Sequence, residues 1–258
     1  GSHVVRELVR RGHAVTVLQR QPAGHGAQVV EVLGDITDGA MVARAMDGCE
    51  AVVHLAAKVS MVGDRRDFER TNVAGTSVVL DAARLAGVSR FVQVSSPSVA
   101  HAGRPLVGAP AMPADPVLAR GEYSRSKAMA ELLALESDRP GFAVTAIRPH
   151  LVWGPGDTQL IGRIVERARR GRLVLVDDGT ALIDTTVVDN AADALAQAVE
   201  HCADPDVHGR PFVVTNGEPR TVGELLHRIA RALGGRAPTR RVPYALAHAA
   251  GSMIEFGW

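Results

Sequence analysis

The chain has 258 residues, enough for one large hydrophobic core or two smaller ones. With 46% hydrophobic residues, 22% charged residues and a formal net charge of +1, it is globular in composition and gives no electrostatic reason to expect nucleic acid as a partner. Cys49 and Cys202 have neither disulfide nor metal-ligand spacing, which favours a cytoplasmic protein without a metal site. No apolar run reaches the roughly 18 residues of a membrane-spanning helix.

Helix and strand patterns alternate along the first 150 residues. The residues before Gly12 have the apolar spacing of an amphipathic helix. After it we expect strand 14–18, a strand ending at Asp35, helix 38–47, a buried strand at AVVHLAA (51–57), a helix at about 68–87, strand RFVQVSS (90–96), helix 122–137 and strand FAVTAIRP (142–149). This order predicts an α/β fold with a doubly wound parallel sheet, whose ligands bind at the carboxyl ends of the strands.

The pattern loosens after residue 155, which predicts a second, smaller part of the chain. We expect residues 1–155 to form the sheet domain and residues 156–258 to form a substrate-binding lobe. A segment at about 183–215 is expected to return to the sheet.

The run YSRSK places Tyr123 and Lys127 four residues apart, on one face of the expected helix. The chain has only two tyrosines and two lysines, so this spacing is unlikely to arise by chance. An unperturbed tyrosine titrates near pH 10, and a neighbouring ammonium group would stabilise its phenolate for acid/base work near neutral pH. The alternative is a surface helix on which the lysine stem covers the tyrosine ring.

Hydroxyl groups end the strand RFVQVSS. On their own, Ser95 and Ser96 more simply satisfy loose backbone groups or begin a turn. Together with Tyr123, at the same end of the sheet, a serine hydroxyl could polarise a carbonyl group for hydride addition.

Several motifs occur in the order of a known family. Ser96, Tyr123 and Lys127, with LGDITD (33–38), HLAA (54–57), RTNVAGT (70–76) and IRPHLVWGPGD (147–157), resemble the extended short-chain dehydrogenases/reductases over essentially the whole chain. The resemblance implies a Rossmann fold that binds NAD or NADP. It implies that Tyr123 is the proton donor and acceptor, that Lys127 lowers its pKa and holds the nicotinamide ribose, and that Ser96 orients the carbonyl group.

The resemblance also implies a set of cofactor contacts. Asp35 and Ile36 match the positions at the adenine, Leu55, Ala56 and Ala57 line the dinucleotide cleft, Asn72 braces the central strands, and Pro149, His150 and Val152 meet the nicotinamide. Taken singly, Asp35 could equally cap helix 38–47 and Asn72 could form a turn.

The run TVLQRQP (16–22) bears on the choice of cofactor. An acidic residue at the end of this strand would bind the ribose 2′-hydroxyl of NAD, whereas an arginine suits the 2′-phosphate of NADP. Gln19 and Arg20 stand there and no carboxylate does, which favours NADP. The alternative is that Arg20 is simply an exposed arginine.

Two departures from the family bear on the substrate. Pro97 and Ser98 stand where a sugar dehydratase needs an acidic pair, and Leu151 stands where sugar-nucleotide enzymes carry asparagine. The runs SSPSV (95–99), IRPHLVWGPGDTQL (147–160) and LIDTTVVDNAADA (182–194) most resemble the 3β-hydroxysteroid dehydrogenase branch. We therefore expect Ser98, Leu151 and Trp153 at a substrate with a bulky apolar body. Val152 and Leu160 could instead pack the junction of the two lobes.

The expected activity is reversible hydride transfer between a nicotinamide and a secondary alcohol or ketone of the 3β-hydroxysteroid, sterol-4-carboxylate or 2-alkyl-3-oxo acid type. The alternatives are a sugar-nucleotide epimerase and a non-catalytic regulator that senses dinucleotides. A homodimer is the family expectation, and the apolar run at 242–258 suggests peripheral contact with a membrane.

In this family a strand and a glycine-rich loop precede the first helix, and the third glycine opens that helix at the pyrophosphate. Gly1 fits that third glycine, so we expect the first strand to be missing from the sequence; a tag remnant is the alternative for GSH. We further expect a polypeptide beginning at Gly1 to bind the dinucleotide weakly, and the activity to belong to the complete protein.

Overall fold

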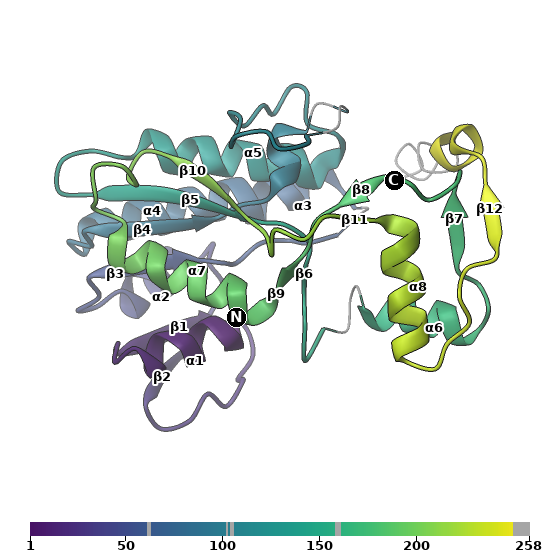
Figure 1. Ribbon diagram of the computed structural model, residues 1–258. Coiled ribbons are helices and arrows are strands. Elements are labelled where there is room, and N and C mark those ends of the chain that lie inside the picture. Colours follow the sequence, from purple (N-terminus) through teal and green to yellow (C-terminus); the bar gives the residue numbers. More distant parts are fainter. Residues whose placement is uncertain (61–62, 102, 104–105, 158–160, 250–258) are drawn as a thin grey trace. The chain divides into compact units, whose positions relative to one another are not determined.

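A computed structural model describes residues 1–60, 63–101, 103, 106–157 and 161–249 (Figure 1). The chain divides into two compact units, of which the first comprises Gly1–Pro149 and Ala191–Val214 and the second His150–Asn190 and Thr215–Trp258. The division falls after residue 149, where the sequence places it after residue 155. The segment that rejoins the first unit lies within the expected 183–215.

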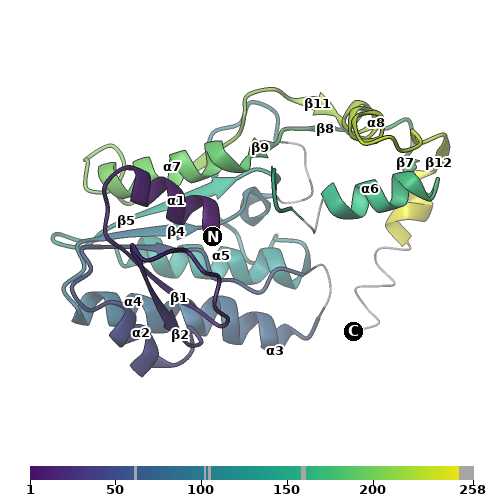
Figure 2. The same cartoon turned by 90° about the horizontal axis from the view of Figure 1, so that it is seen from below.

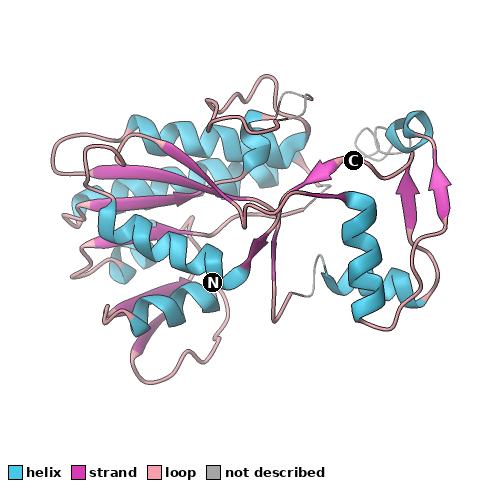
Figure 3. Ribbon diagram, viewed as in Figure 1, coloured by secondary structure: helices cyan, strands magenta, loops and turns pink. Residues whose placement is uncertain are grey.

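The first unit contains a parallel sheet of four strands in the order β10 (Pro211–Val214), β5 (Ala143–Pro149), β4 (Arg90–Val94) and β3 (Ala51–His54) (Figure 3). β1 (Val15–Gln19) and β2 (Val29–Leu33) form a separate parallel pair. Phe91 and Val92, adjacent residues of β4, are buried on opposite faces of the sheet, whereas residues 51–53 of β3, in the run expected to be a buried strand, are half-buried.

Helices cover both faces of the four-stranded sheet (Figure 2). On one face, α2 (Gly39–Ala45), α4 (Gly75–Leu85) and α5 (Gly121–Glu136) pack their apolar side chains around Phe91 and Val144. On the other face, α1 (Ser2–Arg10) and α7 (Val188–His201) pack against Val92 and Ile147. The doubly wound architecture predicted from the sequence is therefore confirmed.

The helix expected at about 68–87 is a longer run with a change of pitch. α3 (Arg65–Phe68) leads without a break into the π-helix η1 (Glu69–Ala74), which leads into α4. Single π-turns inside helices are frequent at functional sites. η1 carries the sequence-predicted Asn72.

The second unit is built from smaller pieces. α6 (Ile161–Arg169) and α8 (Val222–Ala232) pack around Ala168, Leu173 and Ala230. Three two-stranded sheets accompany them: β7 (Val174–Val176) with β12 (Arg240–Val242), β8 (Leu182–Ile183) with β11 (Arg220–Thr221), and β6 (Val152–Trp153) with β9 (Thr186–Val187). Among the described residues of either unit, no helix is both long enough and apolar enough to cross a bilayer.

Candidate active site

The hydroxyl groups of Ser96 and Tyr123 meet at the carboxyl end of β4. Ser96 caps the short helix η2 (Pro97–Ala100), accepting a hydrogen bond from the Ser98 backbone N at 3.3 Å, and its Oγ lies 2.9 Å from Ser98 Oγ. Tyr123 lies in the first turn of α5. Burial raises the pKa of Tyr123, and a hydrogen bond with the Ser96 side chain opposes that rise. Two hydroxyl groups from different elements thus approach one point.

The neighbouring serine has a different environment. The Ser95 backbone N donates a hydrogen bond of 2.7 Å to Ile147 O, which joins the ends of β4 and β5. Its Oγ is buried and has no hydrogen-bond partner among the described residues. Of the two serines, Ser96 is therefore the one whose hydroxyl group reaches Tyr123.

Lys127 lies one turn after Tyr123 and is almost completely buried, with 4% of its surface exposed. Its Nζ donates a hydrogen bond of 2.5 Å to Val94 O, the last carbonyl group of β4. An ammonium group has three N–H donors, so two remain for a ligand. Burial lowers the pKa of Lys127 to about 8, and the negative charge of Glu131 acts in the opposite direction.

A buried histidine at the end of β3 shares this environment. His54 Nε2 lies 3.0 Å from Thr76 Oγ1, and that hydroxyl group donates its proton to Asn72 O at 2.6 Å. Because the threonine proton is already used, His54 Nε2 must be the donor, which defines the neutral tautomer. Burial lowers the pKa of His54 to about 3, and the charge of Lys127 adds to the shift.

Asn72 connects the loop after β3 to α5. Its Oδ1 accepts a hydrogen bond from Lys58 N at 2.6 Å, and its Nδ2 donates to Lys58 O at 3.2 Å and to Ser126 Oγ at 2.9 Å. Ser126 Oγ in turn donates to Tyr123 O at 2.9 Å. The side chain therefore braces a loop against the helix that carries Tyr123, and the expected brace between central strands is corrected to this position.

The residues expected at the adenine follow β2. Asp35 is exposed, and its Oδ1 accepts hydrogen bonds from Thr37 N at 3.0 Å and Thr37 Oγ1 at 2.8 Å. These bonds, with smaller contributions from the charges of Arg20 and Arg70, lower the pKa of Asp35. Asp38 caps α2, so the alternative role of Asp35 as the helix cap is wrong.

Ile36 faces inward instead. A Cβ atom built on Gly75 would lie 2.7 Å from Ile36 Cδ1, so a side chain at position 75 would force the Ile36 side chain to move.

The side chains at the end of β1 form a hydrogen-bonded group around Glu31. Gln19 Nε2 donates to Glu31 Oε2 at 3.1 Å, and the two oxygens of Glu31 also accept hydrogen bonds from Ala23 N at 3.2 Å and His25 N at 2.9 Å. Glu31 therefore holds the loop between β1 and β2. Arg20, the residue after Gln19, is exposed.

The other cofactor residues predicted for the first unit lie at its surface. Leu55 and Ala56 are exposed after β3 and Ala57 is half-buried, while Gly1 is exposed at the start of α1 and Pro149 ends β5. Leu55 and Ala56 supply exposed apolar surface, and Ser96, Tyr123 and Lys127 supply hydroxyl and ammonium groups, which are the kinds of group that a nicotinamide dinucleotide would need.

The remaining predicted residues belong to the second unit. His150 O and Leu151 O accept hydrogen bonds from Thr186 Oγ1 at 2.6 Å and Thr186 N at 3.2 Å. Leu151 has a φ of +30°, a left-handed conformation that is strained for a residue with a side chain. Val152 and Trp153 are exposed.

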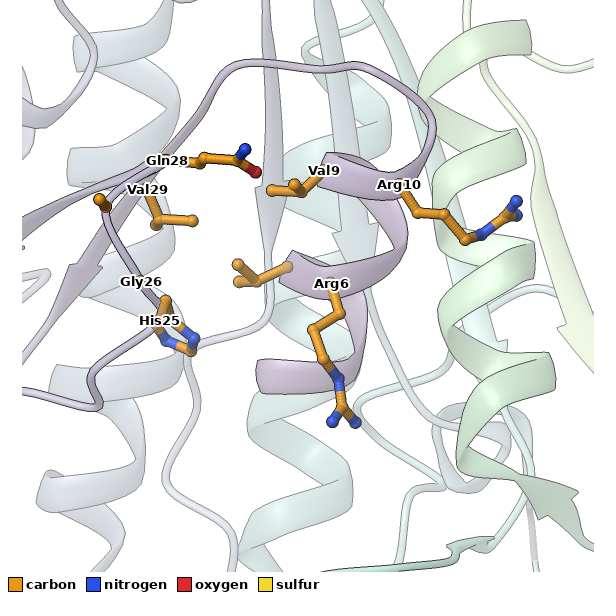
Figure 4. Close-up of a pocket in the computed structure, with 9 residues that line it drawn as sticks. Arg6, Val9, Arg10, His25, Gly26, Gln28 and Val29 are labelled. Atoms are coloured by element: carbon orange, nitrogen blue, oxygen red, sulfur yellow. The ribbon is translucent and has the colours of Figure 1, made fainter.

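A separate cavity of about 350 Å³ lies between α1 and residues 25–29 (Figure 4). Val5, Val9 and Val29 form its apolar lining, and Arg6 and His25 lie at its edge. None of the residues predicted for the active site lines this cavity.

Sequence reasoning missed the buried polar groups around Lys127. His54, Thr76, Glu131 and Arg148 are each at most 4% exposed. The sequence contains two signals: Arg148 in the apolar strand FAVTAIRP, and Glu131 one helical turn after Lys127. They indicate buried ion pairing once the faces of the strand and helix are known.

A doubly wound α/β unit with a serine, a tyrosine and a buried lysine at the carboxyl end of a strand defines a class, the dinucleotide-dependent enzymes with a tyrosine acid/base. The chain belongs to the NAD dependent epimerase/dehydratase family, whose family model matches residues 1–214. The predicted resemblance to extended short-chain dehydrogenases/reductases and the predicted fold class are confirmed.

Similar proteins include oxidoreductases and a dehydratase. The chain is 38% identical to a 2-alkyl-3-oxoalkanoate reductase of Stenotrophomonas maltophilia (strain K279a), over 100% of this chain and 80% of that protein. It is 31% identical to the decarboxylating sterol-4-alpha-carboxylate 3-dehydrogenase of Mus musculus, over 96% of this chain and 70% of that protein. A dTDP-glucose 4,6-dehydratase structure from Streptomyces venezuelae with NAD bound has a TM-score of 0.79 and 27% identity, covering 94% of this chain and 81% of that one.

Proposed function

We propose that the protein transfers a hydride reversibly between a nicotinamide dinucleotide and a secondary alcohol or ketone carried on a bulky apolar substrate. The observation that carries the proposal is the hydrogen bond between the side chains of Ser96 and Tyr123, one helical turn before the buried Lys127. The names of two relatives, a reductase of 3-oxo acids and a 3-dehydrogenase of sterol carboxylates, support the same reaction type.

The mechanism assigns one task to each side chain. Ser96 Oγ and Tyr123 Oη donate hydrogen bonds to the substrate oxygen, which polarises the carbonyl group for addition. The dinucleotide, when bound, supplies the hydride in reduction and accepts it in oxidation. In reduction Tyr123 gives its proton to the substrate oxygen, and in oxidation it removes that proton.

Lys127 makes this proton transfer feasible near neutral pH. Burial alone raises the pKa of Tyr123, so a buried phenol without help would be a weak acid. The Lys127 ammonium group stabilises the phenolate, and its N–H groups not bonded to Val94 O are available to the nicotinamide ribose.

The substrate is proposed to be a 3-hydroxysteroid, a sterol 4-carboxylate or a 2-alkyl-3-oxo acid. Pro97 and Ser98 cannot supply the acid and base that a dehydratase needs, which argues against elimination of water. Exposed Val152 and Trp153, which follow Leu151 in the chain, offer apolar surface in the second unit for a ring system or alkyl chain.

NADP is the preferred cofactor in this proposal. The Glu31 carboxylate, which is bonded to Gln19, also accepts hydrogen bonds from the backbone N–H groups of Ala23 and His25, so three of its roughly four acceptor positions are already used. The exposed Arg20 is a suitable partner for a 2′-phosphate.

The proposal also includes a homodimer, a cytoplasmic location and peripheral membrane contact near the C-terminus. For the contact, Tyr244 and Leu246 are exposed apolar residues of the described part. Residues 250–258, which belong to the same prediction, lie outside the described residues.

The test uses reduced cofactor with 2-alkyl-3-oxo acids and 3-oxosteroids, and oxidised cofactor with 3β-hydroxysteroids and sterol 4-carboxylates, followed by nicotinamide absorbance. Tyr123→Phe is expected to lower kcat/KM by about 10²–10⁴-fold while dinucleotide affinity stays unchanged, because only the transferred proton is lost. Tyr244→Phe is the matched control, since Tyr244 is exposed in the second unit.

Three outcomes would contradict the proposal. Near-wild-type turnover by Tyr123→Phe would refute the acid/base assignment. Conversion of a sugar nucleotide without net change in nicotinamide absorbance would indicate an epimerase. Dinucleotide binding without turnover of any of these substrates would indicate a regulator.

A further inference from the structure

A buried ion pair lies beneath the helix that carries Tyr123 and Lys127. Glu131, on α5, is fully buried, and Arg148, on β5, is 1% exposed. Glu131 Oε2 accepts a hydrogen bond from Arg148 Nε at 2.9 Å, and Glu131 Oε1 accepts a second, short one from Arg148 Nη2. The two parallel bonds hold the carboxylate in one orientation.

The guanidinium group has a third partner that fixes it further. Arg148 Nη1 donates a hydrogen bond of 2.6 Å to Met112 O, in the loop between Ser96 and Tyr123. Arg148 is therefore held by a strand, a helix and a loop at once, and Glu131 cannot turn away without leaving a buried cation unpaired.

Glu131 and Lys127 are four residues apart on α5 and so lie on the same helix face. Lys127 is buried nearly as deeply as the ion pair, and its Nζ has only the neutral carbonyl oxygen of Val94 as a hydrogen-bond acceptor among the described residues. A buried ammonium group without a nearby negative charge tends to lose its proton.

The other charged groups near Lys127 do not replace Glu131. From β3, His54 is neutral, and η1 presents the uncharged Asn72 to α5. The acidic side chains on α3 and η1 have their own cations: Asp67 binds Lys58 at 2.6 Å, and Glu69 binds Arg125 at 2.8 Å. At η2, the uncharged Ser96 hydroxyl group bonds the Tyr123 side chain of α5, and its neighbour Ser98 Oγ, 2.9 Å away, is uncharged as well.

We propose that Glu131, held in place by Arg148, is a positioning residue that keeps the Lys127 ammonium group charged inside the core. The residue does not touch the reacting atoms and acts through Lys127. A buried ion pair is weak evidence for stability, because apolar residues of similar volume often stabilise a fold as well or better. Because Glu131 lies one helical turn after Lys127, its negative charge gives the pair a use that packing alone would not.

The chain offers a direct measurement, because Lys58 and Lys127 are its only lysines. Selective isotope labelling of lysine side chains gives two NMR signals, whose pH titration can be followed without any substrate. In the wild type, Lys127 is expected to titrate near pH 8. Lys58, ion-paired with Asp67 in the loop after β3, supplies the reference signal.

Glu131→Gln keeps the size of the side chain and removes its charge. The Lys127 midpoint is expected to fall by about one pH unit or more, since a nearby opposite charge typically contributes that much. Glu131→Asp keeps the charge and shortens the side chain, and is expected to retain the wild-type midpoint within a few tenths of a unit. Glu136→Gln, at an exposed position of the same helix, is the matched control and is expected to leave the midpoint unchanged.

The double variant Glu131→Gln/Arg148→Met accompanies these in case the single variant fails to fold. It removes both buried charges, and the Lys127 midpoint is again expected below the wild-type value. An unchanged midpoint in the folded glutamine variants would overturn the proposal. A shift in Glu131→Asp as large as that in a glutamine variant would do the same, because it would assign the effect to packing.

The inference rests on the proposed function for its catalytic meaning, and a kinetic measurement connects the two. The alkaline limb of kcat/KM against pH is expected to move to lower pH in Glu131→Gln by the same amount as the Lys127 titration. Absence of turnover on every substrate would count against the proposed function only. The NMR titration would still decide the role of Glu131.

Discussion

Replacing His54 by glutamine tests whether burial keeps the histidine ring at the end of β3 neutral and makes the stability of the fold depend on pH. The His54 ring donates from Nε2 to Thr76 Oγ1 and packs 6.1 Å, centroid to centroid, from Phe91. A glutamine amide can donate to the same hydroxyl group but does not titrate. The variant therefore removes the proton equilibrium while keeping the hydrogen bond.

The magnitude follows from linkage. The pKa of His54 is lowered from 6.5 to about 3, so the unfolded chain takes up a proton first as the pH falls. Stability from the neutral ring is complete above the unfolded pKa and is lost progressively between pH 6.5 and about 3. At about pH 4.5, roughly two pH units below the unfolded pKa, the loss is about 3 kcal/mol of unfolding free energy.

The assay is urea unfolding at about pH 7 and about pH 4.5, followed by far-ultraviolet circular dichroism and by amide exchange in β3 and β4. Tryptophan fluorescence is unsuitable, because Trp153 belongs to the second unit and His54 to the first. The wild type should lose about 3 kcal/mol more than His54→Gln between the two pH values. His101→Gln, at an exposed position, should behave as the wild type. Equal losses in wild type and His54→Gln would refute the reasoning.

Two further predictions concern the ends of β1 and β2. Arg20→Ala is expected to weaken NADPH binding by roughly 10- to 100-fold and leave NADH binding unchanged, because one charge-assisted contact to the 2′-phosphate is lost; equal effects on both cofactors in a titration would contradict it. Asp38→Ala is expected to cost about 1 kcal/mol in urea unfolding, since Asp38 caps α2 at Ala40 N and Met41 N. A cost below about 0.3 kcal/mol would show that the cap is not needed.

Much of the first unit could be predicted from hydrophobic pattern alone. The sequence predicts that the strand AVVHLAA is buried on both faces, but residues 51–53 of β3 are half-buried, and it is β4 that lies inside the four-stranded sheet with helices on both faces. Gly12 ends the first helix region as predicted. The pattern could not reveal the π-turn η1, because an i→i+5 hydrogen-bond ladder has no distinct residue signature.

The candidate reactive residues could be predicted from their spacing in the sequence, whereas the buried groups that hold them in place could not. Tyr123 and Lys127 share a helix face because they are four residues apart, and Ser96 follows the end of β4 as the cap of η2. Val94 O of β4 accepts from Lys127, and Arg148 of β5 holds Glu131 on the same helix as Lys127. Which buried charges meet depends on strand register and helix rotation. The cap of α2 shows the same limit at short range: Asp35 and Asp38 are three residues apart, and only the backbone conformation decides which one caps the helix.

Because the pitch changes in η1, the direction in which α3 points its side chains is independent of the direction in which α4 points its own. α3 is fixed by Asp67, which binds Lys58, and α4 is fixed by Val79 and Leu80 in the core. The wider turn between them absorbs the angular mismatch and points the Asn72 amide group inward. Loss of a single residue in this turn would restore ordinary pitch but rotate one helix by about 100° against its contacts. The segment is therefore fixed in length as well as in composition, a constraint that substitution experiments alone would not reveal.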